Sequence, residues 1–153
     1  MLHIDHLTKH YKGSTKGVTD LTLHIAPGDL YAFIGHNGAG KTTTLKCVSG
    51  IQDWDSGSIT VCGKDLSADP IGCKREMAYI PDNPDLYEYL TGIQYLNFIA
   101  DVFAIPAGER EALIRQYADP FELTASLGDL LSTYSHGMKQ KLAVLSALIH
   151  KPR

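Results

Sequence analysis

The most constraining feature of this sequence is the segment Gly-His-Asn-Gly-Ala-Gly-Lys-Thr at residues 35–42. It matches the pattern G-x-x-x-x-G-K-[ST], in which a glycine-rich backbone turns successive N–H groups toward one chain of phosphates. A continuous apolar run at residues 30–34 precedes the segment, and residues 41–49 predict a helix that ends at Gly50. The alternative is a glycine-rich turn that happens to precede a lysine. A buried strand before the loop and a helix after it favour the phosphate-binding loop.

The residue types in this loop suit a polyphosphate. Glycines let the backbone curl, and the helix that follows offers the positive end of its dipole. Lys41 supplies a mobile cation for the β- and γ-phosphates and is therefore also a candidate catalytic residue. The hydroxyl of Thr42 can ligate Mg²⁺. The sequence thus predicts that a nucleotide polyphosphate is bound by Gly35, His36, Asn37, Gly38, Ala39, Gly40, Lys41, Thr42 and Thr43.

Composition limits the classes of protein that fit. The chain has 153 residues, of which 44% are hydrophobic and 20% charged, and this predicts an ordered globular domain. A net charge of −3 argues against a surface built for nucleic acid, and Lys9, Lys12 and Lys16 are interpreted as solvated surface. No apolar run reaches the ~20 residues of a membrane-spanning helix. The three cysteines follow no metal-binding spacing and predict reduced thiols.

Hydrophobic periodicity predicts a mixed α/β first half followed by a helical second half. Strands are expected at residues 2–7, 18–25, 30–34, 58–61 and 77–80. A helix capped by Thr91 is expected to bury one apolar face. The members of that face are Ile93, Leu96, Ile99 and Phe103. Two further helices are expected at residues 107–117 and 135–150, the second stopped by Pro152.

A second motif follows the loop, where Tyr134-Ser-His-Gly-Met138 precedes Lys-Gln-Lys-Leu-Ala-Val-Leu and Ser135 lies 94 residues after Lys41. With the loop, this motif makes the chain resemble the ATP-binding subunit of an ABC transporter, whose signature Leu-Ser-Gly-Gly-Gln stands at the head of a helix. The sequence departs from that signature at three of its five positions and keeps Ser135 and Gly137. The resemblance spans almost the whole chain.

This resemblance implies a fold and its parts. The expected class is an α/β P-loop NTPase, the ABC-type ATPase core with a mixed or parallel sheet plus a helical subdomain. Residues 1–85 would form the N-terminal part of the ATP-binding core, residues 86–134 the helical subdomain and residues 135–153 the signature-motif helix. The family continues with a strand that carries a Mg²⁺-coordinating Asp and the catalytic Glu, the Walker B motif. Since neither occurs here, the chain is expected to be an N-terminal fragment that lacks hydrolysis by itself.

The resemblance also implies roles for residues outside the loop. Ser135 and Gly137 would contact the γ-phosphate bound to the opposite subunit of a head-to-tail dimer, although an ordinary serine N-cap has the same appearance. Tyr11 occupies the position of an aromatic that stacks on adenine, and its alternative is a half-exposed tyrosine at a strand end. Asp82 stands where the family has a Gln that contacts Mg²⁺ and the attacking water. Its alternative is a turn aspartate ahead of Asn-Pro.

The implied cofactors are ATP and Mg²⁺. The implied partners are a transmembrane permease subunit and a second ATP-binding subunit, identical or different, with no nucleic acid. The implied location is cytoplasmic, on the inner face of the membrane through the permease. Absence of the guanine motif Asn-Lys-x-Asp favours ATP over GTP. The alternatives are a soluble ABC-type ATPase of translation or DNA repair and a fragment that binds nucleotide without hydrolysing it. An aromatic stretch is interpreted either as core packing or as the groove that docks the permease: Tyr87, Tyr89, Tyr95 and Phe98.

Overall fold

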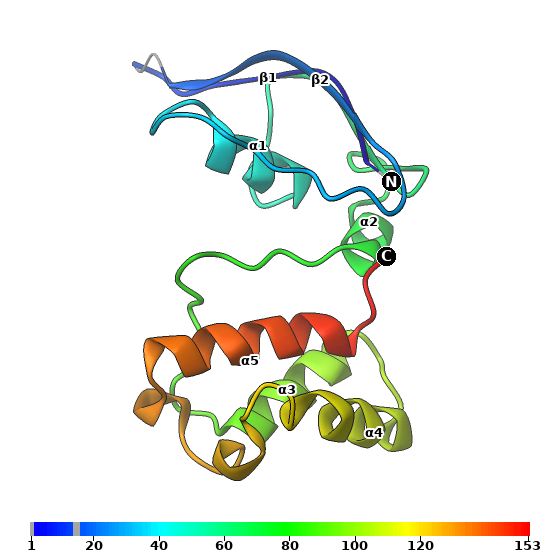
Figure 1. The fold of residues 1–153 in the computed structure, drawn as a ribbon. Helices are drawn as coiled ribbons and strands as arrows, with labels where there is room; N and C mark the ends of the chain where they lie inside the picture. Colours follow the sequence, from blue (N-terminus) through cyan, green and yellow to red (C-terminus); the bar gives the residue numbers. More distant parts are fainter. Residues whose placement is uncertain (1, 14–15) are drawn as a thin grey trace. The chain divides into compact units, whose positions relative to one another are not determined.

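The structure, a computed structural model, describes residues 2–13 and 16–153. The chain divides into two compact units, Met1–Ala78 together with Arg153, and Tyr79–Pro152 (Figure 1). The predicted division at residues 85 and 134 stays a prediction, and Met1, Ser14 and Thr15 within its first part lie outside the described residues. No helix in the described part of the chain is both long enough and apolar enough to cross a membrane.

The first unit is built on an antiparallel sheet with the strand order β2-β1-β3-β4. The strands are β1 Leu2–His10, β2 Gly17–Ile25, β3 Ser56–Val61 and β4 Lys64–Asp65. Ile4 in β1 pairs with Leu23 on one side and with Ile59 on the other. The buried face of this sheet packs against Cys47 and Cys73 from two helices. The strands expected at residues 2–7, 18–25 and 58–61 are therefore confirmed.

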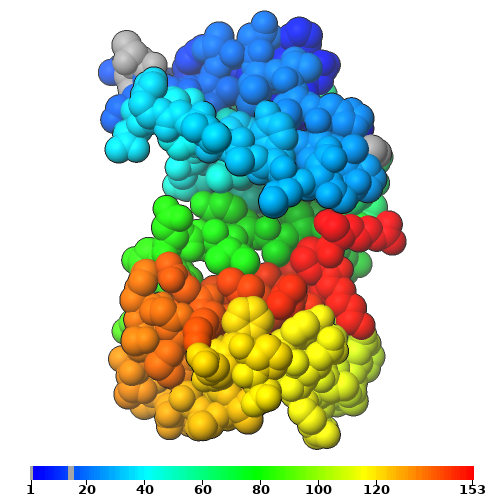
Figure 2. Space-filling view, in the orientation of Figure 1, coloured from blue at the N-terminus to red at the C-terminus, as the bar shows by residue number. Residues whose placement is uncertain are grey.

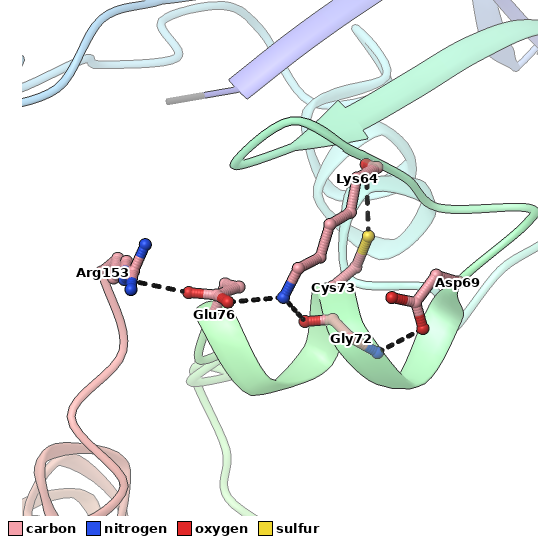
Figure 3. Close-up of polar contacts among 6 residues, drawn as sticks. All are labelled: Lys64, Asp69, Gly72, Cys73, Glu76 and Arg153. Carbon is pink, nitrogen blue, oxygen red and sulfur yellow. Dashed lines mark hydrogen bonds and ion pairs between the residues drawn. The ribbon is translucent and has the colours of Figure 1, made fainter.

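Two helices complete the first unit. Helix α1 covers Lys41–Val48, and the backbone after it turns at Gly50, whose φ is 64°. Helix α2 covers Pro70–Glu76, and its N-cap is Asp69, whose carboxylate accepts the Gly72 N–H at 2.8 Å (Figure 3). None of the three cysteines, all in the described part of the chain, forms a disulfide. Burial raises the pKa of the Cys47 and Cys73 thiols above the ordinary value, so these two groups are unreactive structural thiols.

Glu76 joins the end of α2 to two other parts of the first unit. Its carboxylate forms ion pairs with the Lys64 ammonium at 2.6 Å and with the Arg153 guanidinium at 3.3 Å, as Figure 3 shows. The Arg153 backbone N–H also donates to the Glu76 carbonyl oxygen at 2.9 Å. The hydrogen bond from Lys64 lowers the pKa of the Glu76 carboxyl and raises that of Lys64, so both groups stay charged around neutral pH.

Two predicted strands do not form. Residues 30–34 and 77–80 have no strand assignment, and the side chains of Leu30 and Ile34 are 101% and 93% exposed. Figure 2 shows the segment around residues 30–40, sky blue to cyan, on the surface of the first unit. A strand needs a neighbour to satisfy its backbone N–H and C=O groups, and neither segment joins the four strands of the described sheet. The described sheet is antiparallel throughout, which corrects the expectation of a mixed or parallel sheet.

The second unit is helical. Its helices are α3 Gly92–Val102, α4 Ala107–Ala118 and α5 His136–Ile149, with short 3₁₀ turns at Thr124–Ser126 and Leu131–Thr133. Thr91 and Gln94 form a reciprocal capping box at the start of α3. Helix α5 packs against both α3 and α4 (Figure 1). The three predicted helices are confirmed to within two residues at each end, apart from Phe103, which lies just beyond α3 as its C-cap.

Candidate nucleotide-binding site

The predicted phosphate loop closes around the side chain of Lys41. The Lys41 ammonium donates to the carbonyl oxygen of Gly35 at 2.5 Å and to that of His36 at 2.9 Å. The Ala39 N–H donates to the same His36 carbonyl at 3.2 Å and tightens the turn. These partners are neutral carbonyl groups rather than carboxylates. No carboxylate among the described residues pairs with Lys41, so its positive charge is available to an anion at the loop.

Two glycines in the loop have backbone conformations that other residues rarely adopt. Gly38 has φ of 91° and Gly40 has φ of 85°. A Cβ atom at Gly40 would lie 2.5 Å from the Gly17 carbonyl oxygen and 2.8 Å from the Val18 side chain, whereas a Cβ at Gly38 would meet open space. Gly40 is therefore needed both for its φ and for close packing of the loop against the start of β2, and Gly38 for its φ alone.

Helix α1 begins directly at the loop and leaves its first turn open. Its N-cap is Gly40, which has no side chain to accept the first N–H groups. Thr44 is buried and donates its hydroxyl to the Gly40 carbonyl at 3.0 Å, while Thr42 is exposed. An uncapped helix start beside a lysine suits a phosphate group, because both the N–H groups and the dipole attract negative charge.

A site for Mg²⁺ is consistent with these side chains. Across residues 2–13 and 16–153, no three His, Cys, Asp or Glu side chains converge to form a metal site of their own. Mg²⁺ generally keeps several waters and binds through one or two protein ligands plus substrate phosphates. The exposed hydroxyl of Thr42, at the second position of α1, fits such a ligand.

Tyr11 lies beside the loop although it is distant in sequence. Its hydroxyl is 3.4 Å from the Thr43 hydroxyl at the start of α1, and the residue is 37% exposed. The structure thus brings the predicted adenine platform to the first turn of the helix that carries Lys41. Lys9, interpreted from the sequence as solvated surface, is only 14% exposed and pairs with Asp55 at 3.2 Å. No local pattern in the sequence marks this pair, because Lys9 lies in β1 and Asp55 lies 46 residues later, just before β3.

The signature-like segment starts helix α5 in the second unit. Ser135 is the N-cap, and its hydroxyl oxygen accepts the Met138 N–H at 3.2 Å. Gly137 is exposed, and a Cβ atom there would meet nothing within 4 Å. The capping role, the simpler of the two interpretations, is therefore present. A capping hydroxyl keeps its own hydrogen for a second partner, so contact with a phosphate remains a prediction.

Asp82 lies in the second unit, whereas Tyr11 and the phosphate loop belong to the first. The residue is exposed, and its carbonyl oxygen accepts the Gln140 side-chain amide at 3.0 Å. This bond ties the segment around Asp82 to helix α5. A role for its carboxylate in binding Mg²⁺ or in catalysis stays a prediction.

The aromatic stretch forms a surface cluster. Tyr87 lies at the centre, 5.5 Å between ring centroids from Phe98, 5.9 Å from Tyr89 and 6.4 Å from Tyr95. Tyr95 packs against the core of the second unit, but Tyr87, Tyr89 and Phe98 are exposed. Core packing therefore explains only one of the four rings.

Comparisons with known proteins identify the relatives of this chain. The family model described as ABC transporter matches residues 18–153. The uncharacterized ABC transporter ATP-binding protein YhcH of Bacillus subtilis (strain 168) is 31% identical over 100% of this chain and 49% of its own length. A solved ATP-binding subunit of an ABC transporter is 32% identical with a TM-score of 0.91, covering 99% of this chain and 63% of that one.

A third comparison concerns the fold alone. The post-hydrolysis dimer of the ATP-binding cassette MJ0796, bound to ADP and Pi, has a TM-score of 0.83 at 18% identity over 99% of this chain and 71% of that one. The chain spans about half the length of the first curated relatives that it matches. These likenesses confirm the α/β class and the P-loop NTPase fold. Given a family match that covers nearly all its residues, the chain belongs to the ABC transporter family of ATP-binding proteins.

Proposed function

We propose that this chain is the nucleotide-binding part of an ABC transporter ATPase subunit, which binds ATP with Mg²⁺. The observation that supports this most is the loop around Lys41, where an unneutralised ammonium group stands beside an uncapped helix start. Calorimetric titration of the folded chain with ATP and Mg²⁺ tests the proposal. Saturable binding of one nucleotide per site is expected, and no binding by a folded chain would overturn it.

In the whole protein, we propose that the same residues support hydrolysis of ATP. Phosphoryl transfer depends on positioning and on stabilisation of developing charge. Lys41 and the N–H groups of the loop would hold the β- and γ-phosphates, and Thr42 and Asp82 would ligate Mg²⁺. Mg²⁺ supplies further neutralisation of the phosphate oxygens. The 153-residue chain alone is expected to bind nucleotide without turnover.

We propose two partners for the whole protein. Ser135 and Gly137 would close the site on a second ATP-binding subunit, as the dimeric state of MJ0796 suggests. The exposed rings of Tyr87, Tyr89 and Phe98 would dock a transmembrane permease, which would hold the subunit at the cytoplasmic face of the membrane. A soluble ATPase of translation or DNA repair is the second candidate. The 94-residue spacing from Lys41 to Ser135 leaves no room for the long coiled-coil insert found in some such proteins.

Replacing Tyr11 by alanine is expected to weaken ATP binding about 5- to 150-fold, because stacking on a base contributes ~1–3 kcal/mol. Tyr11→Trp is expected to stay near the wild-type affinity, since stacking needs a flat ring and not a hydroxyl. Calorimetric titration of both variants with ATP measures the difference. Equal affinities of the alanine and tryptophan variants would rule out Tyr11 as the adenine platform.

Replacing Ser135 by glycine separates capping from phosphate contact. Glycine is a tolerated N-cap, so the free energy of unfolding should fall by only about 0.3 kcal/mol. In the whole protein, formation of an ATP-dependent dimer, measured by sedimentation, is expected to be lost. Ser132→Gly, at an exposed serine outside the motif, is the matched control and should dimerise normally. A Ser135→Gly chain that dimerises like the control would limit Ser135 to its capping role.

A further inference from the structure

Asp55 belongs to none of the motifs described above, yet it contacts three successive residues at the end of β1. Its carboxylate accepts the His10 backbone N–H at 2.6 Å and the Lys9 ammonium at 3.2 Å. Its own backbone N–H donates to the Thr8 carbonyl oxygen at 2.8 Å. The residue that follows His10 in the sequence is Tyr11. Asp55 therefore holds the backbone that leads directly into the predicted adenine platform.

The pattern of backbone pairing in the sheet explains why the end of β1 needs such support. Pairing of β1 with β3 ends where Thr8 lies opposite Ser56, while pairing with β2 continues to His10. Beyond Thr8, the β3 side of the strand has no strand residue left to accept its N–H groups. The Asp55 carboxylate takes the place of a ladder carbonyl there, because it accepts the His10 N–H.

The same carboxylate fixes a cation beside the ring. The Lys9 ammonium lies 5.9 Å from the centroid of the Tyr11 ring, within the range of a cation–π contact. The ring is anchored at its other end by the approach of its hydroxyl to Thr43. The His10 N–H, and then Lys9, lower the pKa of the Asp55 carboxyl below its ordinary value, so the group is ionised at neutral pH. A ring held at both ends loses less freedom when a flat ligand stacks on it.

We propose that Asp55 is a positioning residue for the nucleoside part of the ligand: it acts through Tyr11, and it makes the site prefer nucleoside triphosphates over bare polyphosphate. The inference rests on the proposed function, because Tyr11 must be the surface on which the base stacks. Asp55 does not touch the loop or the phosphates. Its contribution is to the base alone.

The test compares ATP with inorganic tripolyphosphate, which has the phosphates but no base. Asp55→Ala is expected to weaken ATP about three- to tenfold through a less ordered Tyr11 and to change tripolyphosphate affinity by less than about twofold. Asp53→Ala is the matched control, since it removes a neighbouring exposed carboxylate. Asp55→Asn keeps an acceptor for the His10 N–H and should recover part of the ATP affinity.

Two further measurements separate the possible failures. In a Tyr11→Ala background, Asp55→Ala should have no additional effect on ATP, because the residue through which it acts is gone. Amide exchange of His10 and Tyr11 should be faster in ligand-free Asp55→Ala, and in Asp55→Asn it should be intermediate. An equal loss for ATP and tripolyphosphate, or an unchanged ATP affinity, would overturn the inference while leaving the phosphate loop intact. A wild-type chain that binds tripolyphosphate no better than buffer would overturn the proposed function and the inference together.

Discussion

Lys41→Ala is expected to abolish ATP binding or to weaken it at least about 100-fold, since charge-assisted hydrogen bonds contribute ~1.5–3 kcal/mol each. The reason is local. Lys41 is the lysine that the loop wraps, its charge is unpaired by any carboxylate among the described residues, and it lies at the first position of α1. Calorimetric titration with ATP and with tripolyphosphate measures the loss, and both ligands should lose affinity together.

Two controls make this result interpretable. Lys46→Ala removes an exposed lysine from the last turn of the same helix and should leave the affinity unchanged. Circular dichroism of Lys41→Ala should match the wild type, because the side chain contributes to no core. A folded Lys41→Ala chain that still binds ATP at wild-type affinity would show that residues 35–42 are a turn and not a phosphate-binding loop.

The second large effect concerns association of the 153-residue chain. Residues 30–34 expose apolar side chains next to unpaired backbone groups, and such a segment is a template for another strand. The chain is therefore expected to form dimers or larger species at micromolar concentration. Light scattering should show a weight-average mass that rises with concentration, well above the 16.7 kDa of one chain.

Charged substitutions locate the associating surface. The double variant Leu30→Lys/Ile34→Lys should return the mass toward that of a monomer, because lysine on a strand edge opposes pairing. Ile71→Lys is the matched control, since Ile71 is exposed on α2 but lies outside the segment. A wild-type chain that stays monomeric at high concentration would contradict the prediction. Equal effects of the control and the double variant would assign association to general hydrophobicity.

The parts of the structure that follow from local chemistry could be predicted from the sequence. Glycine conformations, the capping box at Thr91 and the serine that starts α5 each depend on residues within four positions of one another. The Asp69-Pro70 pair is a start signal of the same kind for α2, and it was missed because the helix has only seven residues. Strand β4 was missed for the same reason, since two residues carry no periodicity.

The parts that depend on distant partners could not be predicted. The run at residues 30–34 has the composition of a buried strand, but burial needs a neighbour that composition does not supply. The contact of Asp55 with the His10 backbone joins residues 45 apart and uses an amide that every residue except proline has. No pattern of side chains can signal such a bond. The approach of Tyr11 to Thr43 was anticipated only through resemblance to a family.

The bonds between Glu76 and Arg153 have a consequence for how such a chain can be altered. The backbone leaves the first unit after Ala78 and re-enters it at Arg153, and the Arg153 N–H is 2.9 Å from the Glu76 carbonyl oxygen. Departure and return therefore lie almost side by side, as they do where one domain is inserted into another. A segment inserted at such a point has its two ends already close together. The length and sequence of the inserted segment can therefore vary with little change in the entropic cost of closing it.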